Sequence, residues 1–466
     1  MLRFYLTSLL FVAFCLITVA NAQSFDQPET VPAAERRSLL ELYQMATKND
    51  MRYQASLANY EANLLEPSIS RAQLLPQISF RANRTKINDQ KIRGFNPDRQ
   101  IDRFNQQRGT TNHFQRRNMT LSLEQSIFNR RHYVELAQSR SMAQRALFEL
   151  QSAEHDLLER VVGAYFMVLD SKTRLDFTRA QKEAVERQLE QARDRFEVGL
   201  ATITDVREAE ASYDLTIADE ISNETELSVN LSKLQIIVNE NIPMLRVLSE
   251  DSPIVNPEPQ NIDAWVKTSS EQNPQLLAER LTVNIAQDEV KRQRADHFPT
   301  LGAYVRRNER ESLGDSPPGG TESTTRDTEL GLELQIPLFA GGETYYRVKQ
   351  AAQFALESQK QLEETHRTVK QQTQESYLNV LASISRTQAL RRAVDSAQSA
   401  YESNEIGFRV GTRSSVDVLL AVEDLFAAKR DYLMARHRYI IDIISLKKMA
   451  GILSERDIQQ IDQWLR

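Results

Sequence analysis

Hydrophobic and polar residues alternate strictly in four segments of the chain, which predicts four β-strands that each have one apolar and one polar face. Two polar segments, residues 87–115 and 307–326, separate the members of each strand pair and predict long loops. The apolar positions of the four segments are Ile78, Phe80 and Ala82; Met119, Leu121, Leu123 and Ile127; Leu301, Ala303 and Val305; and Leu330, Leu332, Leu334, Ile336 and Leu338.

After each strand pair the pattern changes to that of long helices. No proline occurs between Asp98 and Ile242 or after Pro337, and these stretches are rich in good helix formers. The stretch from Asn129 to Val198 predicts one helix of roughly 70 residues, about 100 Å long. Such a length favours coiled-coil packing over an ordinary helical bundle. Apolar residues recur there at spacings of four and three, as at Val185, Leu189, Ala192 and Phe196, and at Leu419, Val422, Phe426 and Leu433.

The chain contains an internal repeat. Residues 195–199 (RFEVG) return 212 residues later as residues 407–411 (GFRVG), and residues 204–206 (TDV) return as residues 416–418 (VDV). Each half therefore has the predicted order helix, proline, strand, polar loop, strand, long helix, turn and long helix. A fold made of two structural repeats follows from this order.

The N-terminus has the pattern of a secretory signal peptide. Arg3 precedes an apolar run from Phe4 to Val19, and Ala20-Asn21-Ala22 fits the small-residue cleavage site. The single cysteine, Cys15, follows the bulky Phe14, so we expect no lipid anchor. The predicted parts of the chain are a signal peptide (residues 1–22), a first repeat (23–250), a proline-containing linker (251–261), a second repeat (262–450) and a C-terminal segment (451–466).

Composition and charge narrow the possible functions. The chain has 58 Lys and Arg against 64 Asp and Glu, so it has no basic excess for binding nucleic acid. A membrane-spanning helix needs about 18 consecutive apolar residues, and no run after residue 30 is that long. The alternating strands still allow a membrane β-barrel. The six histidines lack zinc-ligand spacing, and no phosphate-binding or nucleophile motif occurs. We therefore expect no enzyme, no cofactor and no metal site.

The four strands are too few to form a closed barrel by themselves. The smallest membrane barrels have about eight strands. A soluble sandwich would show the same alternation, but the signal peptide and the long polar loop within each strand pair are typical of an outer-membrane barrel. The chain is therefore expected to oligomerise in order to complete the barrel.

The residues at the ends of the long helices make the chain similar to the outer-membrane efflux protein family of channel-tunnels, over roughly residues 38–460. The most specific stretches are residues 180–189, 195–206 and 410–419. The resemblance implies an α+β membrane protein that forms a homotrimer. Four β-strands per subunit would complete one 12-stranded outer-membrane β-barrel, which a long α-helical coiled-coil barrel continues into the periplasm, where the C-terminal segment also lies.

The function that the resemblance implies is a passive exit duct for drugs or secreted proteins. Its partners would be a periplasmic adaptor (membrane fusion) protein and an inner-membrane efflux pump or an ABC transporter for type I secretion, with lipid around the barrel. The periplasmic end would be closed by a gate of inward-curling coiled coils.

The resemblance also implies the roles of particular residues. The gate latch matches Thr204 and Asp205 on one coil and Phe408 and Arg413 on the other, and a partly wet Arg-to-Asp pair contributes about 1 kcal/mol. Asp417 matches an aspartate that forms a ring of carboxylates at the entrance constriction, where it would attract cations. The adaptor-docking tips match Val198, Gly199, Leu200, Val410, Gly411 and Thr412.

Two positions depart from the family pattern. Phe408 stands where the family commonly has a tyrosine, so a latch hydrogen bond from a phenolic hydroxyl cannot form. Leu420 stands where a second entrance aspartate is common, which leaves one carboxylate ring. We predict a gate that is less strongly bonded and an entrance that is less sensitive to multivalent cations than in other members.

Two other readings compete with the export duct. The first is a structural or adaptor-type periplasmic coiled coil without a pore, which explains the helices and the signal peptide but not two repeated strand pairs. The second is a cell-envelope hydrolase, which would need a catalytic site within residues 87–115 or 307–326. Carboxylate pairs elsewhere lie on charged helix faces, where solvation is their ordinary role.

Overall fold

The computed structural model of the chain describes residues 36–90, 111–249, 251–314 and 323–466, so the predicted signal peptide lies outside the described residues. The helices are α1 (Leu39–Asn49), α2 (Met51–Leu64), α3 (Glu66–Ala72), α4 (Arg130–Glu197), α5 (Ile203–Val238), α6 (Ile262–Gln272), α7 (Pro274–Ala295), α8 (Glu343–Arg409), α9 (Ser415–Ala450) and α10 (Glu455–Asp462). The strands are β1 (Arg36–Arg37), β2 (Gln77–Gln90), β3 (Thr111–Phe128), β4 (Met244–Leu245), β5 (Thr300–Gly314) and β6 (Ser323–Gln335).

The two halves of the chain have the same element order, which confirms the predicted repeat. A strand pair is followed by a helix of 68 residues and one of 36 in the first half, and by helices of 67 and 36 residues in the second. The predicted rod from Asn129 to Val198 is α4. It begins where the Asn129 side chain accepts a hydrogen bond from the backbone N–H of Arg131 at 3.0 Å, which satisfies one free donor of the first turn.

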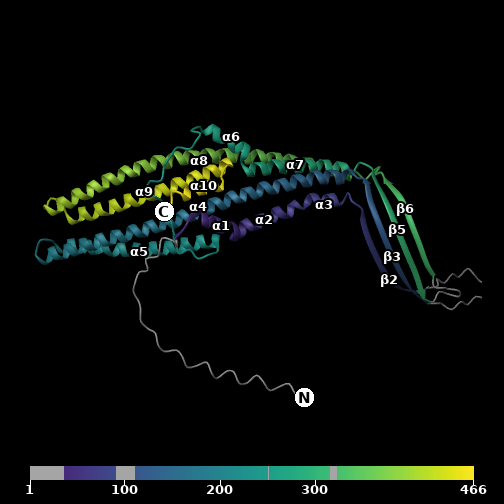
Figure 1. Cartoon of the computed structure of the whole chain (residues 1–466), viewed down its shortest axis with the longest axis horizontal. Coiled ribbons are helices and arrows are strands. Elements are labelled where there is room, and N and C mark those ends of the chain that lie inside the picture. Colours follow the sequence, from purple (N-terminus) through teal and green to yellow (C-terminus); the bar gives the residue numbers. More distant parts are fainter. Residues whose placement is uncertain (1–35, 91–110, 250, 315–322) are drawn as a thin grey trace, which may run out of the picture. The chain divides into compact units, whose positions relative to one another are not determined.

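The four long strands form one antiparallel sheet in the order β2-β3-β5-β6 (Figure 1). The pairing runs without interruption from β2 to β3 and from β5 to β6, and one irregularity interrupts the β3–β5 register at residues 126–128. Strands β2 and β6 are the edges of this sheet, and within the described chain their outer sides are unpaired. An edge of this length is a template for pairing with another strand.

The strands are longer at their far ends than the alternating segments predicted, whereas β6 ends at Gln335, before the predicted positions Ile336 and Leu338. β2 continues to Gln90 and β3 begins at Thr111, so the predicted loop at residues 87–115 is strand at both ends. Similarly, β5 runs to Gly314 and β6 begins at Ser323, inside the predicted loop at residues 307–326. The alternation stops because polar side chains occupy both faces of these outer segments, so hydropathy no longer reports the extended backbone. The remaining parts of the two loops lie outside the described residues.

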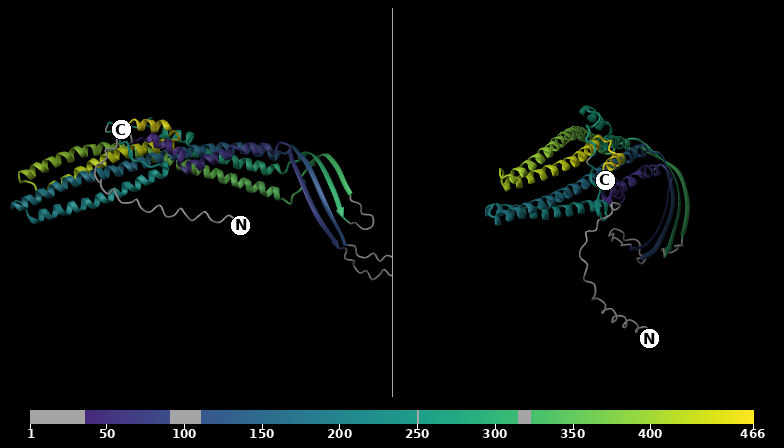
Figure 2. Two further views of the ribbon diagram at one scale, coloured as in Figure 1. Left: turned by 60° about the horizontal axis from the view of Figure 1, so that its bottom comes forward. Right: turned by 60° about the vertical axis from the view of Figure 1, so that its left-hand side comes forward.

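The long helices form two antiparallel pairs, α4 with α5 and α8 with α9, which lie side by side in both views of Figure 2. Among the predicted coiled-coil positions, Val185, Leu189 and Ala192 are buried together with Val206, Ala209 and Leu419, which come from α5 and α9. Phe196 is the fourth position predicted in the first run. It is 43% exposed, because it lies in the last turn of α4 and does not belong to this buried cluster.

The largest apolar core lies around the middle of the long helices and includes residues from both ends of the chain. Tyr165 and its repeat equivalent Tyr377 are both buried in it. Arg466 and Val247 exchange two backbone hydrogen bonds of 2.9 Å, so the C-terminal segment is paired with the segment after β4. Within the described residues, none of the helices combines the length and the apolar character needed to cross a lipid bilayer.

Candidate functional site: the helix turns and the residues around them

The turn between α4 and α5 is closed by a glycine in the left-handed backbone conformation. Gly199 has φ +74°, and the N–H of Leu200 donates to the carbonyl of Arg195 at 2.7 Å. Other residue types rarely adopt this conformation, which ends a helix tightly. Helix α5 then starts at Thr202, whose hydroxyl accepts from the N–H of Asp205 at 3.2 Å while Asp205 Oδ2 accepts from the N–H of Thr202 at 2.8 Å.

The turn between α8 and α9 repeats this geometry. Gly411 has φ +82°, and the N–H of Thr412 donates to the carbonyl of Gly407 at 2.8 Å. Helix α9 starts at Ser414, whose hydroxyl accepts from the N–H of Asp417 at 3.2 Å, and Asp417 Oδ2 accepts from the N–H of Ser414 at 2.9 Å. The two turns are therefore structural equivalents, as the repeated sequence predicted.

Asp205 and Asp417 have the same local role, since each is the third residue of its helix and completes a capping box. The hydrogen bonds from the Ser414 N–H and hydroxyl, with Arg413 nearby, hold the pKa of Asp417 below its usual value, so this carboxylate stays charged. The sequence carried the signal, a Ser or Thr three positions before an acidic residue at the start of each apolar run.

Arg413 lies against its own turn. A Cβ atom built on Gly407 would be 2.6 Å from Arg413 Cγ, so the glycine leaves the space that the arginine side chain occupies. Within one described chain Arg413 forms no ion pair with Asp205, whose carboxylate accepts hydrogen bonds from Thr202. Thr204 is exposed in the first turn of α5. Three of the four predicted latch residues, Thr204, Asp205 and Arg413, are thus not joined to one another within a single chain.

Phe408 has a partner that the sequence did not predict. The guanidinium carbon of Arg195, near the end of α4, lies 4.7 Å from the centre of the Phe408 ring on α8. This distance is within the range of a cation–π interaction, which contributes about 0.5–1 kcal/mol at an exposed site. The contact connects the ends of the two helix pairs.

The predicted docking residues form the outermost part of each turn. Gly199 and Gly411 have open space where a side chain would be. Three apolar side chains are presented to solvent, since Val198, Leu200 and Val410 are each 69% exposed.

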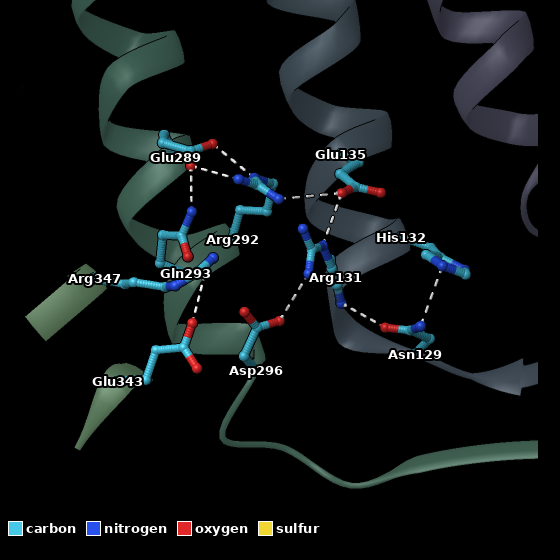
Figure 3. Close-up of polar contacts among 10 residues, drawn as sticks. All are labelled: Asn129, Arg131, His132, Glu135, Glu289, Arg292, Gln293, Asp296, Glu343 and Arg347. Carbon is cyan, nitrogen blue, oxygen red and sulfur yellow. Dashed lines mark hydrogen bonds and ion pairs between the residues drawn. The ribbon is translucent and has the colours of Figure 1, made fainter. Parts of the chain in front are cut away.

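The opposite ends of the helices, next to the sheet, have a different chemistry (Figure 3). Arg131 on α4 bonds Glu135 at 3.0 Å and Asp296 at 3.2 Å, and Arg292 on α7 bonds Glu289 through two contacts of 2.6 and 2.7 Å. Arg292 also lies 3.6 Å from Glu135, so the network connects α4 with α7. The hydrogen bonds from Arg292 hold the pKa of Glu289 below its usual value. Here ion pairs join two helices, whereas Asp205 and Asp417 at the turns accept hydrogen bonds from residues of their own segments.

Comparison with known proteins agrees with this geometry. A family model described as "Outer membrane efflux protein" matches residues 42–240 and 265–452. The chain is 32% identical to the outer membrane protein TolC of Vibrio cholerae over 429 residues, covering 92% of this chain and 94% of the relative. It is 28% identical to the alkaline protease secretion protein AprF of Pseudomonas aeruginosa over 436 residues, covering 91% of this chain and 86% of AprF.

The fold is shared with a solved outer membrane channel. The crystal structure of the Campylobacter jejuni CmeC outer membrane channel superposes with a TM-score of 0.71 and 15% identity, and covers 97% of this chain and 98% of CmeC. A four-stranded sheet that continues into paired long helices is therefore the fold that this chain shares with that outer membrane channel. The chain belongs to the outer membrane efflux protein family. It is an outer-membrane duct for efflux or secretion, which excludes the reading as a coiled coil without a pore.

Proposed function

We propose that the chain works as a homotrimeric exit duct whose periplasmic end is gated by the two helix turns. Four strands from each of three chains form a 12-stranded barrel, and the long helices continue it as a tunnel. The duct is passive, and a periplasmic adaptor docks it to an inner-membrane pump or to an ABC transporter for type I secretion. Family membership supports the trimer and these partners.

The observation that carries the proposal is the sheet with two unpaired edges. Strands β2 and β6 have 14 and 13 residues, so the outer edge of one chain can pair with the opposite edge of the next along nearly its full length. A head-to-tail contact of this kind produces a closed ring when the rotation between subunits closes. Two copies would supply eight strands and three would supply twelve, and the family supports three.

The gate is formed by contacts around the turns. Arg413 bonds Thr204 and Asp205 of a neighbouring chain, where Asp205 accepts the capping hydrogen bonds through Oδ2. Arg195 holds Phe408 within the chain and takes the place of a tyrosine hydroxyl bond. Each contact is weak alone, but threefold symmetry repeats it, so a docking partner can widen a gate that is constricted at rest.

The docking surface comprises Val198, Gly199 and Leu200 on the first turn and Val410, Gly411 and Thr412 on the second. Replacement of Gly199 by Asn tests it, because asparagine accepts a positive φ and places a side chain in the open space outside the turn. Export should fall while the purified trimer and its conductance stay unchanged. Loss of the folded trimer would instead assign Gly199 a purely structural role.

Single-channel current in a planar lipid bilayer tests the gate. The native chain should give a small stable conductance, and Arg413→Ala should raise it several-fold, with Arg195→Ala giving a smaller rise. Arg207→Ala is the matched control. Arg207 is an exposed arginine near the turn between α4 and α5, and it pairs with Glu210 on its own helix. An unchanged conductance in both gate variants would refute the latch and keep the duct, whereas folded protein without any conductance would refute the open pore.

The entrance constriction is assigned to Asp417. This carboxylate accepts its hydrogen bonds through Oδ2, so its charge can face a cation in the lumen. Leu420 is 56% exposed three residues later and provides a test by gain of function. Leu420→Asp should lower the concentration of cobalt hexammine that blocks the conductance, and Asp417→Asn should raise it. If cobalt hexammine blocks the native chain, Leu420→Asp and Asp417→Asn at the same concentration, the carboxylate ring at the entrance is refuted.

A further inference from the structure

One face of the sheet changes from apolar to basic along the strands. In an antiparallel sheet, residues paired across neighbouring strands have their side chains on the same face. The row of this face that spans all four strands nearest the helices is Ile78, Leu123, Val305 and Leu330, which pair in that order and are all apolar. Three rows farther from the helices, Arg84 is paired with Arg117, and the next residue of β2 on this face is Lys86.

Five cationic side chains lie on this face, each farther from the helices than Ala82, Met119, Val305 or Leu330 of its own strand, and all five are exposed. We call them the basic belt. Two carboxylates, Glu309 and Glu311, lie among them, at 3.0 Å from Arg326 and 3.6 Å from Arg117. The belt therefore has three cations in excess on each chain. Its members are Arg84, Lys86, Arg117, Arg307 and Arg326.

The opposite face of the same strands does not have this excess. Among the strand residues whose side chains the structure describes, this face has four basic and four acidic ones, and they are distributed along the strands, as with Arg306 and Glu124 at 3.1 Å. A balanced face is typical of an aqueous lumen, whereas an excess of one sign beside an apolar band indicates a partner of opposite charge. The basic residues are Arg81, Arg116, Arg306 and Arg310, and the acidic ones are Glu124, Asp327, Glu329 and Glu333.

The boundary between the apolar and basic residues runs obliquely across the sheet. On β2 the last apolar residue is Ala82, but on β6 it is Leu330, which lies in the row of Ile78. The boundary therefore shifts by four residues, about 13 Å, across three strand spacings of about 4.8 Å each. The boundary therefore slopes by about 45° relative to the direction perpendicular to the strands. Strands in a membrane barrel are tilted by about 35–45°, so residues at one membrane depth follow an oblique line of this slope across the sheet.

The belt lies at the end of the strands away from the helices. On this face the described strand residues nearer the helices include no cation, so the charge is confined to one of the two membrane surfaces. With the helices in the periplasm, that surface is the outer leaflet. The outer leaflet of this membrane is built from lipopolysaccharide, whose lipid carries phosphate groups. Arginine side chains bind phosphate through two parallel donors.

We propose that the basic belt is a binding site for the phosphate groups of lipopolysaccharide, and that the apolar rows beneath it contact the acyl chains of the same lipid. The assignment rests on the proposed barrel, because that barrel places this face toward lipid. Arg84 and Arg307 are its central contacts. Arg84 has a neutral partner, the side-chain amide of Gln115 at 3.0 Å, and Arg307 forms no ion pair with the described residues, so both charges are available to the lipid.

The test is a titration of the full chain, reconstituted in a small bilayer disc, with lipopolysaccharide. Arg84→Gln with Arg307→Gln should weaken binding about twenty-five-fold, because each basic group near an anionic lipid surface contributes a factor of about five. Arg81→Gln with Arg310→Gln is the matched control, since it removes the same charge from the same two strands on the opposite face, and its binding should be unchanged. Lipopolysaccharide whose phosphates have been removed should bind the native chain as weakly as the intact lipid binds the first variant.

Three results would overturn the proposal: equal binding by both double variants, full binding of the dephosphorylated lipid, or an unchanged dissociation constant in Arg84→Gln with Arg307→Gln. Arg84→Lys with Arg307→Lys should keep most of the affinity, and its measurement decides the question if the glutamine variant does not fold. Single-channel conductance of the same proteins separates the two hypotheses. Conductance without lipid binding refutes the belt alone, and absence of conductance in the native chain refutes the duct.

Discussion

The turn between α4 and α5 and the turn between α8 and α9 share a backbone but place their arginines differently. In the first, Arg195 precedes the turn and Ala201 follows it; in the second, the equivalent positions are Gly407 and Arg413. Arg413 occupies the space that Gly407 leaves free, while Arg195 reaches across to Phe408. Duplication thus preserved the glycine and the capping box, which hold the turn, and allowed the charged residue to move to the side where it contacts a different partner.

The largest effect should follow from removing the feature that both turns share. Gly199→Val and Gly411→Val place a β-branched residue at φ +74° and +82°, which should cost about 1–2 kcal/mol of local stability or more. Amide hydrogen exchange at Leu200 and Thr412, whose N–H groups close the turns, should accelerate about tenfold. Gly199→Asn and Gly411→Asn are the controls. Native protection in the valine variants would show that the turn does not depend on the left-handed residue.

Removing one capping hydroxyl should destabilise its turn less than the valine substitutions do. The loss of stability should be equal in the two turns. Thr202→Ala and Ser414→Ala each break the bond from the aspartate N–H, which is 3.2 Å long in both, and each should cost about 1 kcal/mol. Hydrogen exchange of the first turns of α5 and α9 measures this cost. A large difference between the two variants would contradict the structural equivalence of the capping boxes.

Arg195 should matter less for stability, and only where Phe408 is present. Arg195→Ala should cost about 0.5–1 kcal/mol, the usual contribution of an exposed cation–π contact. A double-mutant cycle with Phe408→Leu isolates the coupling between the two side chains, and Phe408→Tyr, which keeps an aromatic ring, should retain it. Coupling that is absent from the cycle would mean that the arginine acts through the solvent or through another residue.

The smallest effect concerns pH at the second turn. The Ser414 N–H and hydroxyl lower the pKa of Asp417 in the folded chain, so its stabilising contribution is present above the unfolded value near 3.8 and is lost as pH falls through the lower folded value. Hydrogen exchange of α9's first turn, corrected for its intrinsic pH dependence, should therefore increase below pH 3.8. Asp417→Asn should abolish this increase, and an identical increase in that variant would assign it to other groups.

The sequence predicted the features that depend on local pattern. Strand alternation, the proline-free helical stretches and the glycines at both turns were sufficient for the repeat, the four strands and the two helix pairs. The capping boxes at Thr202 and Ser414 were also readable locally. In contrast, the contact of Arg195 with Phe408 joins residues far apart in sequence, and only the packing of α4 beside α8 and α9 brings them together.

The strand ends show another limit of sequence patterns. Beyond Ala82 on β2 and before Met119 on β3, both faces of the sheet have polar residues, so the period-two signal ends while the hydrogen-bonded ladder continues. Hydropathy reports what surrounds a strand rather than its backbone. The change from apolar to polar residues ends the hydropathy signal of the strands. Once the residue pairing is known, the same change identifies the basic belt on one face.

The hydrogen bond from the N–H of Leu39 to the carboxylate of Asp462, at 2.9 Å, has a consequence for the order of biogenesis. It joins residues separated by 423 positions, and the same core contains buried side chains of α10. Nearly all of the chain must therefore be synthesised and exported before this core can close. Until then the alternating strands have no partners in the ring, so the time between secretion and assembly is when the chain most needs protection from aggregation.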